Sequence, residues 1–316
     1  MVSTATNGTN KTNESRDPKT VPPSFAPSLL PPAPSHIIHY IWIQGVEHLR
    51  NHAPVFFENL SLWPRMFSGW EVRVWDDASI RRELAATDKE LGLDLVSVYD
   101  GAAKMAVKAD IARYPILYTH GGLYVDADLE CLRPFAHMLL PDRVTAMTRN
   151  LYDVVERRHL ARTNNSIFYM PQRKCAAALA MMRRVATRPL PSTTEQVLTY
   201  AGPKALFEVL TTTPGDVQWL PVDMFEPVQI HTMNKHGLRG DAARAAFPFA
   251  FTAHTYTMSW LPSSGRRLLL SVSKTMAYVL QQRTLLAIVL LVVLLVFVPV
   301  CVVFITLWAV SRRHRA

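Results

Sequence analysis

The chain has 316 residues, of which 49% are hydrophobic and 19% charged, a composition too apolar for an intrinsically disordered protein. Three cysteines exclude a scaffold built on disulfides. The net charge of +9 would suggest a nucleic-acid partner, but residues 262–316 hold seven basic and no acidic residues, which leaves about +2 elsewhere. The charge therefore accompanies the C-terminal segment, and we expect no nucleic-acid partner.

Residues 1–35 are rich in Ser, Thr and Asn and then in Pro, which predicts a disordered tether without an apolar leader. Residues 36–262 form the predicted globular body. Within it, short apolar runs alternate with helical patterns, which predicts an α/β domain with a mainly parallel sheet. In such sheets ligands bind at the carboxyl ends of the strands. In chain order we expect a strand at 36–45, a helix at 52–62 stopped by Trp63-Pro64, a strand at 70–77, a helix at 78–91 capped by Asp76 or Asp77, a helix at 102–117 and a strand at 123–132.

Asp110 and Arg113 lie three residues apart on the predicted helix 102–117 and therefore share a face. A surface ion pair, which contributes little to stability, is one explanation. The helix is otherwise lined by Ala and Ile and ends just before a Gly-Gly turn, which favours a functional pair. Pro115 lies in the same helix and is expected to bend it.

Asp126 and Asp128 are two residues apart at the end of an apolar strand that follows the glycines. In an extended segment both carboxylates would point to one side. A bare Asp-x-Asp is often only a solvated turn. Two acids at the end of a buried strand repel each other, however, and a hard divalent cation such as Mg²⁺ or Mn²⁺ would relieve this repulsion. Such an ion could also balance the charge of a diphosphate leaving group.

Residues 284–310 contain no charge and exceed the roughly 20 apolar residues that cross a bilayer, so we predict a transmembrane helix. Pro299 is tolerated in such a span. The alternative is a buried core helix, although these rarely run so long without a polar residue. The span is preceded by a basic juxtamembrane segment at 263–283 and followed by a basic tail at 311–316.

The side of the membrane that carries the body stays open. A C-terminal span favours insertion after synthesis, with the body in the cytosol, and the flanking charges barely decide the orientation. Sequons argue weakly for the lumenal side; they begin at Asn7, Asn10, Asn13, Asn59 and Asn164. We expect a single-pass protein of an endomembrane of the Golgi or ER type, with a possible regulatory or assembly partner acting through the span.

The stretch KMAVKADIARYPILYTHGGLYVDADLECLRPF, residues 104–135, resembles the DxD sugar-binding region of glycosyltransferase family 32. This family includes inositol phosphoceramide mannosyltransferases and initiating α-1,6-mannosyltransferases. HIIHYIWIQG at 36–45, GPKALFEVL at 202–210 and HTYTMSW at 254–260 resemble further family segments, so the resemblance covers about residues 36–261. It implies a GT-A-type, Rossmann-like nucleotide-sugar-binding α/β domain, here with one C-terminal transmembrane helix.

The resemblance also implies roles for particular residues. Asp110, Arg113, Asp126 and Asp128 form the implied catalytic set, and Asp126, Asp128 and His254 the implied metal ligands. Trp42 is expected to stack on the base, with a core tryptophan as the alternative. Asn164 and Asn165 resemble a loop that carries an asparagine near the sugar, and Ser259 and Trp260 are expected at the diphosphate. The nucleotide-sugar-binding set is Trp42, Asp110, Arg113, Tyr124, Asp126, Asn164, Asn165, Ser259 and Trp260.

The implied function is a metal-dependent transferase that retains the anomeric configuration. We expect Mn²⁺ or Mg²⁺ as cofactor, GDP-mannose as the nucleotide-sugar donor, and a membrane acceptor, an inositol phosphoceramide-type sphingolipid. With no obvious nucleophile for the β-face of the sugar, a same-face reaction with the leaving phosphate as base is the expected course.

Several alternatives stay open. The transferase could use another nucleotide sugar, or a glycoprotein or glycan acceptor. A tail-anchored protein could bind nucleotide sugars without catalysis, although the intact acidic and basic residues argue against it. A metal-dependent phosphohydrolase would need further ligands for a second ion. Cys131 and Cys175 could pair or stay reduced.

Overall fold

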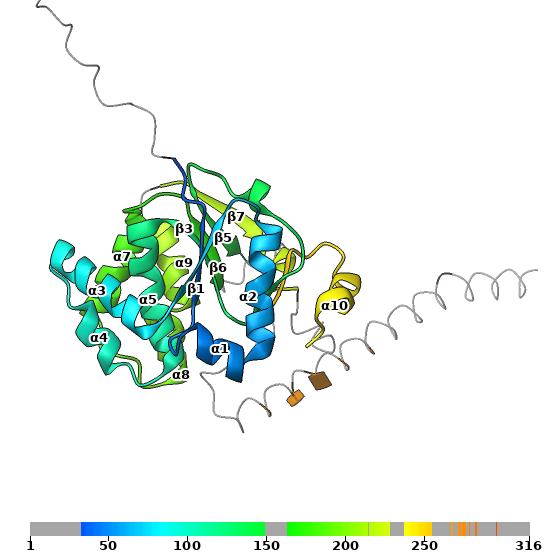
Figure 1. Ribbon diagram of the computed structural model, residues 1–316, viewed down its shortest axis with the longest axis horizontal. Coiled ribbons are helices and arrows are strands. Elements are labelled where there is room, and N and C mark those ends of the chain that lie inside the picture. Colours follow the sequence, from blue (N-terminus) through cyan, green and yellow to red (C-terminus); the bar gives the residue numbers. More distant parts are fainter. Residues whose placement is uncertain are drawn as a thin grey trace, which may run out of the picture. The chain divides into compact units, whose positions relative to one another are not determined.

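The computed structural model describes residues 33–148, 163–213, 215–227 and 237–254, together with 267, 271–272, 274–275, 278, 282 and 295. Within these ranges, six strands form one sheet in the order β2-β1-β3-β6-β5-β7, and β4 and β8 form a separate pair (Figure 1). The strands are β1 (Ile37–Ile41), β2 (Glu71–Trp75), β3 (Gly122–Val125), β4 (Leu129–Cys131), β5 (Val144–Thr148), β6 (Thr163–Met170), β7 (Val217–Pro221) and β8 (Thr252–His254).

Helices cover the faces of this sheet, with α3, α4, α5, α7 and α9 on one face and α2 on the other (Figure 1). The helices are α1 (Val46–His52), α2 (Pro54–Met66), α3 (Asp77–Leu91), α4 (Leu95–Gly101), α5 (Met105–His120), α7 (Ala176–Thr187), α8 (Thr194–Tyr200), α9 (Pro203–Thr212) and α10 (Gly240–Ala246). Short 3-10 turns lie at Ala136–Met138 and Val222–Met224.

The strand directions bring several chain segments to one end of the sheet. β1, β2 and β3 are parallel, and β5 and β7 run in the same direction, whereas β6 runs against them. The end where β1, β3, β5 and β7 finish is therefore also where β6 begins. We call it the carboxyl edge. The residues after β3, the first residues of β6 and the residues after β7 meet there.

Successive side chains along a strand point to opposite faces of the sheet, and so they form two hydrophobic cores. Leu123 and Val125 of β3 pack into the cluster that contains Trp63 of α2, whereas Tyr124 packs into the cluster that contains Tyr114 of α5. This is the two-residue period of a strand buried on both faces. The sheet lies between the two cores, and its strand ends are held in place from both sides.

The main sheet is mainly parallel, as expected, with β6 as its one antiparallel strand in the part of the chain that the structure describes. The predicted strand 123–132 was wrong in its length, because β3 ends at Val125 and a turn follows, closed by the Leu129 N–H donating to the Asp126 carbonyl at 3.1 Å. β4 then leaves the main sheet and pairs with β8. The two aspartates therefore lie in a turn, and not in an extended segment.

Other predicted boundaries shift because packing overrides local signals. The helix expected at 52–62 is α1 followed by α2, and α2 continues through Pro64 to Met66. Trp63 and Phe67 are buried beside this proline, which explains why the helix does not stop. The helix expected at 102–117 begins at Met105, after the unpredicted α4, and runs past Pro115 to His120.

The cap of α3 is confirmed. The Asp76 carboxylate accepts from the Ser79 N–H at 2.8 Å, and the Ser79 hydroxyl accepts from the Asp76 N–H at 2.9 Å. This reciprocal capping box fixes the start of the helix.

His39 links β1 to the turn that precedes β3, and it is fully buried. The Trp75 indole N–H donates to His39 Nδ1 at 3.1 Å, so the other ring nitrogen carries the proton and donates to the Gly121 carbonyl at 2.7 Å. Burial lowers the pKa of His39 to about 3, and the charge of Arg73 adds to this effect. The neutral ring is thus part of the native structure.

Acid should therefore destabilise the fold through His39. Between pH 6.5 and about 3 the unfolded chain binds a proton on this residue that the folded chain excludes. The free energy of unfolding should fall by about 1.4 kcal/mol per pH unit from this group below pH 6.5 and be unaffected by it above. Urea titrations at pH 7 and pH 5 should show this slope for the native chain and a shallower one for His39→Gln. Equal slopes would contradict the prediction.

The C-terminal expectations fall largely outside the described residues. No helix within those residues combines the length and the apolar character that a membrane crossing requires. Apart from Leu295, the predicted span 284–310 is not among them, and neither is the tail 311–316. The tether 1–35 is described only from residue 33 onward, and the juxtamembrane segment 263–283 only at isolated positions.

Candidate active site

The turn after β3 is held through its backbone. The Asp126 N–H donates to the Ser166 carbonyl of β6 at 2.7 Å. The Ala127 carbonyl accepts from the Tyr40 hydroxyl at 2.7 Å and from the Asn59 amide at 3.3 Å. These bonds come from β6, β1 and α2, so three separate elements fix the turn that carries the aspartates.

Asp126, Asp128 and His254 converge at this turn. Each offers one ligand atom, and these atoms lie within 4.8 Å of one another. The cause is the β4–β8 pairing, which sets His254 opposite Leu129. His254 Nε2 lies 3.2 Å from the Asp128 carboxylate. The two carboxylates suit Mn²⁺ or Mg²⁺, and the imidazole nitrogen favours a transition-metal ion, so the donor set fits Mn²⁺ best of the two expected metals.

Burial and the neighbouring charges shift the pKa values of His254 and Asp126 in this cluster. Burial lowers the pKa of His254, but the carboxylates of Asp128, Glu226 and Asp126 outweigh burial and raise it above its ordinary value. Burial also raises the pKa of Asp126, which Arg113 opposes and Asp128 reinforces. A concentration of negative charge is thus built into the carboxyl edge, and a cation would be favoured there.

Asp110 and Arg113 form a buried pair and not a surface pair. They are 8% and 3% exposed, and their charged groups approach to 2.8 Å. Arg113 also lies 3.5 Å from the Asp126 carboxylate and stacks 4.3 Å from the centre of the Tyr124 ring. Burial raises the pKa of Asp110 to about 7 against the opposing charge of Arg113. The pair is thereby joined directly to the aspartate turn.

Tyr124 and Asn165 complete this network. The Tyr124 hydroxyl donates to Asp126 Oδ1 at 2.7 Å. The side-chain amide of Asn165 donates to Asp110 Oδ1 at 2.9 Å, and the backbone carbonyl of Asn165 accepts from the Arg113 guanidinium. β3, α5 and β6 therefore supply one continuous polar cluster at the carboxyl edge.

Asn164 and Asn165 were expected on a loop. This was wrong, because both lie near the start of strand β6. Pairing with β5, which sets Asn164 opposite Met147, makes this segment a strand. The side-chain oxygen of Asn164 accepts a hydrogen bond from the Ser166 N–H at 2.8 Å. Its amide nitrogen is buried and has no partner among the described residues. This leaves a hydrogen-bond donor beside the site.

Trp42 follows β1 at the carboxyl edge. Its indole N–H donates to His48 Nδ1 at 3.2 Å, and its ring lies edge-on to Phe56. It is only partly buried, and it packs at the margin of a core cluster. Both expected roles, base stacking and core packing, remain compatible with this position. Ser259 and Trp260 lie outside the described residues.

Sequence reasoning missed Ser166 and Glu226. The Ser166 hydroxyl donates to the Glu226 carboxylate at 2.6 Å, and both residues are buried. A lone acid within the apolar segment MFEP was the available signal for Glu226. Ser166 carries no such signal, because its role depends on strand pairing. Cys131 and Cys175, whose pairing was left open, are both free thiols.

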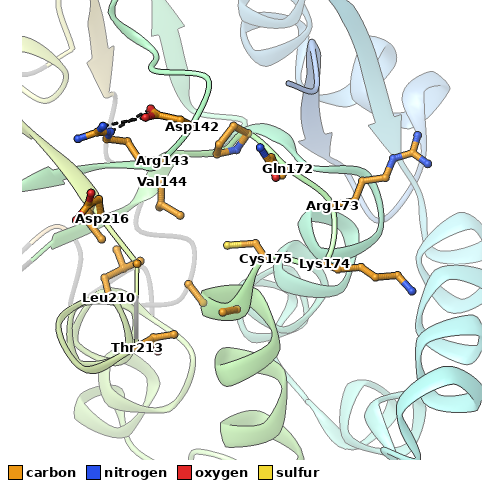
Figure 2. A pocket seen from close by; sticks show the side chains of 15 residues that line it. Asp142, Arg143, Val144, Gln172, Arg173, Lys174, Cys175, Leu210, Thr213 and Asp216 are labelled. Atoms are coloured by element: carbon orange, nitrogen blue, oxygen red, sulfur yellow. Dashed lines mark hydrogen bonds and ion pairs between the residues drawn. The ribbon is translucent and has the colours of Figure 1, made fainter. Parts of the chain in front are cut away.

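A pocket of about 220 Å³ lies at the opposite end of the sheet, where β6 ends and β5 and β7 begin (Figure 2). Its lining includes Val144, Cys175 and Leu210, and none of the predicted site residues. The side chains of Arg173 and Lys174 point away from it (Figure 2). We place the candidate site at the carboxyl edge, where the buried charges converge, and not at this pocket.

Residues 57–146 match a family described as a glycosyltransferase sugar-binding region containing a DXD motif. An uncharacterised glycosyltransferase of Acanthamoeba polyphaga mimivirus is 36% identical over 104 residues, which are 33% of this chain and 39% of that protein. Inositol phosphoceramide mannosyltransferase 3 of Schizosaccharomyces pombe is 39% identical over 70 residues, 22% of this chain and 18% of that protein. The solved PaToxG glycosyltransferase is 15% identical, with a TM-score of 0.42 over 56% of this chain and 69% of that one.

These matches confirm the resemblance to the family 32 glycosyltransferases. The segment 57–146 that matches the sugar-binding family contains Asp110, Arg113 and the aspartate turn. The chain spans less than half the length of the curated relatives it matches.

Arg113→Lys should show that the guanidinium, and not only its charge, is needed. A lysine cannot contact Asp110, Asp126 and the Asn165 carbonyl together. We expect a loss of about 1–3 kcal/mol in the free energy of unfolding, from hydrogen bonds to buried charged groups. Urea denaturation measures it. Arg143→Lys is the matched control, because its exposed pair with Asp142 should change stability by less than about 0.5 kcal/mol. Equal losses would refute the prediction.

Proposed function

We propose that this chain is a metal-dependent, retaining glycosyltransferase with a GT-A-type domain. The observation that carries the proposal is the joining of two groups at one sheet edge: the buried Asp110–Arg113 pair and the Asp126–Asp128–His254 cluster. A binding surface alone would not need buried charges that burial disfavours. Charges arranged before the substrate arrives are what stabilise a transition state.

Each group has a part in the proposed reaction. Asp126, Asp128 and His254 would hold Mg²⁺ or Mn²⁺, which supplies the positive charge that a departing diphosphate requires. Asp110 and Asn165, already bonded to each other, orient the sugar hydroxyls of the donor. Arg113 opposes the rise in the pKa of the Asp110 carboxyl that burial causes, and it adds positive charge beside Asp126.

The anomeric carbon loses its bond to the diphosphate oxygen and gains one to the acceptor oxygen on the same face. The acceptor proton passes to the leaving phosphate, which serves as base. A covalent sugar–enzyme species trapped and detected by mass spectrometry would contradict this course.

The finer proposal is that mannose moves from GDP-mannose to an inositol phosphoceramide-type sphingolipid. Supporting it are the family resemblance and the name of the Schizosaccharomyces pombe relative. The uncharged run 284–310 supports a single-pass protein of an endomembrane, anchored beside a lipid acceptor. A basic segment before the run suits an anionic membrane surface or headgroup.

The test is donor hydrolysis by the full chain in detergent, with Mn²⁺ and a panel of sugar nucleotides. Release of GDP from GDP-mannose that chelation of the metal abolishes would support the proposal. Preference for a UDP-sugar would overturn the choice of mannose. Binding of a donor without turnover, even with membrane lipid extracts added as acceptors, would overturn catalysis and favour a nucleotide-sugar-binding protein.

A further inference from the structure

Ser166 joins parts of the site that come from different elements. Its N–H is held by the Asn164 side chain at 2.8 Å, and its carbonyl accepts from the Asp126 N–H at 2.7 Å. Its hydroxyl donates to the Glu226 carboxylate at 2.6 Å. A single strand residue thus contacts the metal-site turn through its backbone and a buried acid through its side chain.

Glu226 lies beyond β7 at the carboxyl edge and is 7% exposed. The preceding residues are tied to β8, because the Phe251 N–H donates to the Met224 carbonyl at 2.7 Å and the Thr252 hydroxyl donates to the Phe225 carbonyl. β8 ends at His254. The carboxylate of Glu226 acts electrostatically on the His254 ring, but it is not one of the three groups that lie within 4.8 Å of one another.

These contacts bond Glu226 to Ser166 and bond its neighbour Phe225 to β8, the strand that ends at His254. A histidine that binds a metal commonly has a carboxylate or carbonyl facing its other side, which sets ring orientation and raises the basicity of the ligand nitrogen. A buried carboxylate is also costly unless it is paired. Glu226 has such a pairing with Ser166, and its negative charge acts on the ring that offers a nitrogen to the cluster.

We propose that Ser166 and Glu226 are positioning residues of the metal site: Ser166 fixes the Asp126 turn, and Glu226 holds the His254 imidazole for a divalent cation. This inference rests on the metal site of the proposed function. It adds two residues outside the segment 57–146 that matches the glycosyltransferase family. It also explains why β6 and the segment after β7 carry buried polar groups at this edge.

The test measures Mn²⁺ binding by the full chain, from the free Mn²⁺ signal in electron paramagnetic resonance. Glu226→Gln keeps an oxygen that accepts from the Ser166 hydroxyl, so the fold should persist and the melting temperature should stay close to that of the native chain. The Mn²⁺ dissociation constant should rise about 10-fold, which is the lower end of the loss in metal affinity when a residue that orients a metal ligand is replaced. Glu83→Gln is the matched control, since Glu83 also faces a histidine, His120 at 3.1 Å, at the opposite end of the sheet.

Ser166→Ala completes a double-mutant cycle. If Ser166 acts through Glu226, it should weaken Mn²⁺ binding in the native chain and weaken it far less when Glu226 is already Gln. Unchanged Mn²⁺ affinity in Glu226→Gln would overturn the inference. Complete loss of binding would make Glu226 a ligand and overturn the positioning role.

The metal inference and the proposed function fail in different ways. A native chain that binds no Mn²⁺ overturns the metal site and this inference together. A native chain that binds Mn²⁺ tightly and loses affinity in Glu226→Gln, but turns over no sugar nucleotide even with membrane lipid extracts added as acceptors, supports the inference while overturning the transferase.

Discussion

Asp128→Asn should lower metal-dependent donor turnover by about 10²–10³-fold, the loss typical when one preorganised group is removed from a developing charge. The substitution keeps the size of the side chain and removes its charge. Asp128 is the carboxylate that pairs with His254 at 3.2 Å and completes the three-residue cluster. Without it, two ligands remain to hold a divalent cation beside the diphosphate. Steady-state kinetics over a range of Mn²⁺ concentrations would measure the effect.

The matched control is Asp142→Asn. Asp142 also pairs with a basic side chain, Arg143 at 2.8 Å, but the pair is exposed and lies at the opposite end of the sheet. Its turnover should equal that of the native chain. Full turnover by Asp128→Asn, at Mn²⁺ concentrations that do not saturate the native chain, would show that the cluster holds no catalytic metal. Melting temperatures separate a lost site from a lost fold.

Features encoded within a few residues were predictable from the sequence. The Asp76 cap, the strands around Ile37–Ile41 and Glu71–Trp75, and the shared face of Asp110 and Arg113 all depend on short spacing. Local hydrogen bonds and periodicity decide these features, and the rest of the fold does not oppose them. The candidate site was predictable to the same extent, because its core lies within one continuous motif.

Features that depend on distant partners were not predictable from local patterns, and the placement of His254 beside the aspartates was expected only from the family resemblance. The break after Val125 follows from β4 pairing with β8, more than one hundred residues later in the chain. Asn164 and Asn165 lie in a strand because the start of β6 pairs with the end of β5. Ser166 and Glu226 are 60 residues apart and meet only because both reach the carboxyl edge. No local pattern contains these pairings, since each arises from the order of strands in the sheet.

Gly122→Ala should destabilise the fold by roughly 3–5 kcal/mol, by combining backbone strain with steric overlap. Gly122 has φ of +104°, and a Cβ there would lie 2.4 Å from the Ile37 carbonyl oxygen and 2.9 Å from His39 Nε2. Neither neighbour can retreat easily: Ile37 begins β1, and His39 holds the Gly121 carbonyl at 2.7 Å. Such a loss is a large part of the 5–15 kcal/mol that stabilises a typical domain.

Gly69→Ala separates the two contributions. Gly69 also has a positive φ, +82°, but a Cβ there would meet nothing within 4 Å. It should therefore lose only the backbone term, about 1–2 kcal/mol. Urea denaturation of both variants gives the difference, which is the cost of separating β1 from β3. β3 leads directly into Asp126. The folded fraction of Gly122→Ala should therefore bind Mn²⁺ more weakly than the native chain. Equal losses in the two variants would mean that the β1–β3 contact tolerates a methyl group, and that the site is not held as tightly as these contacts indicate.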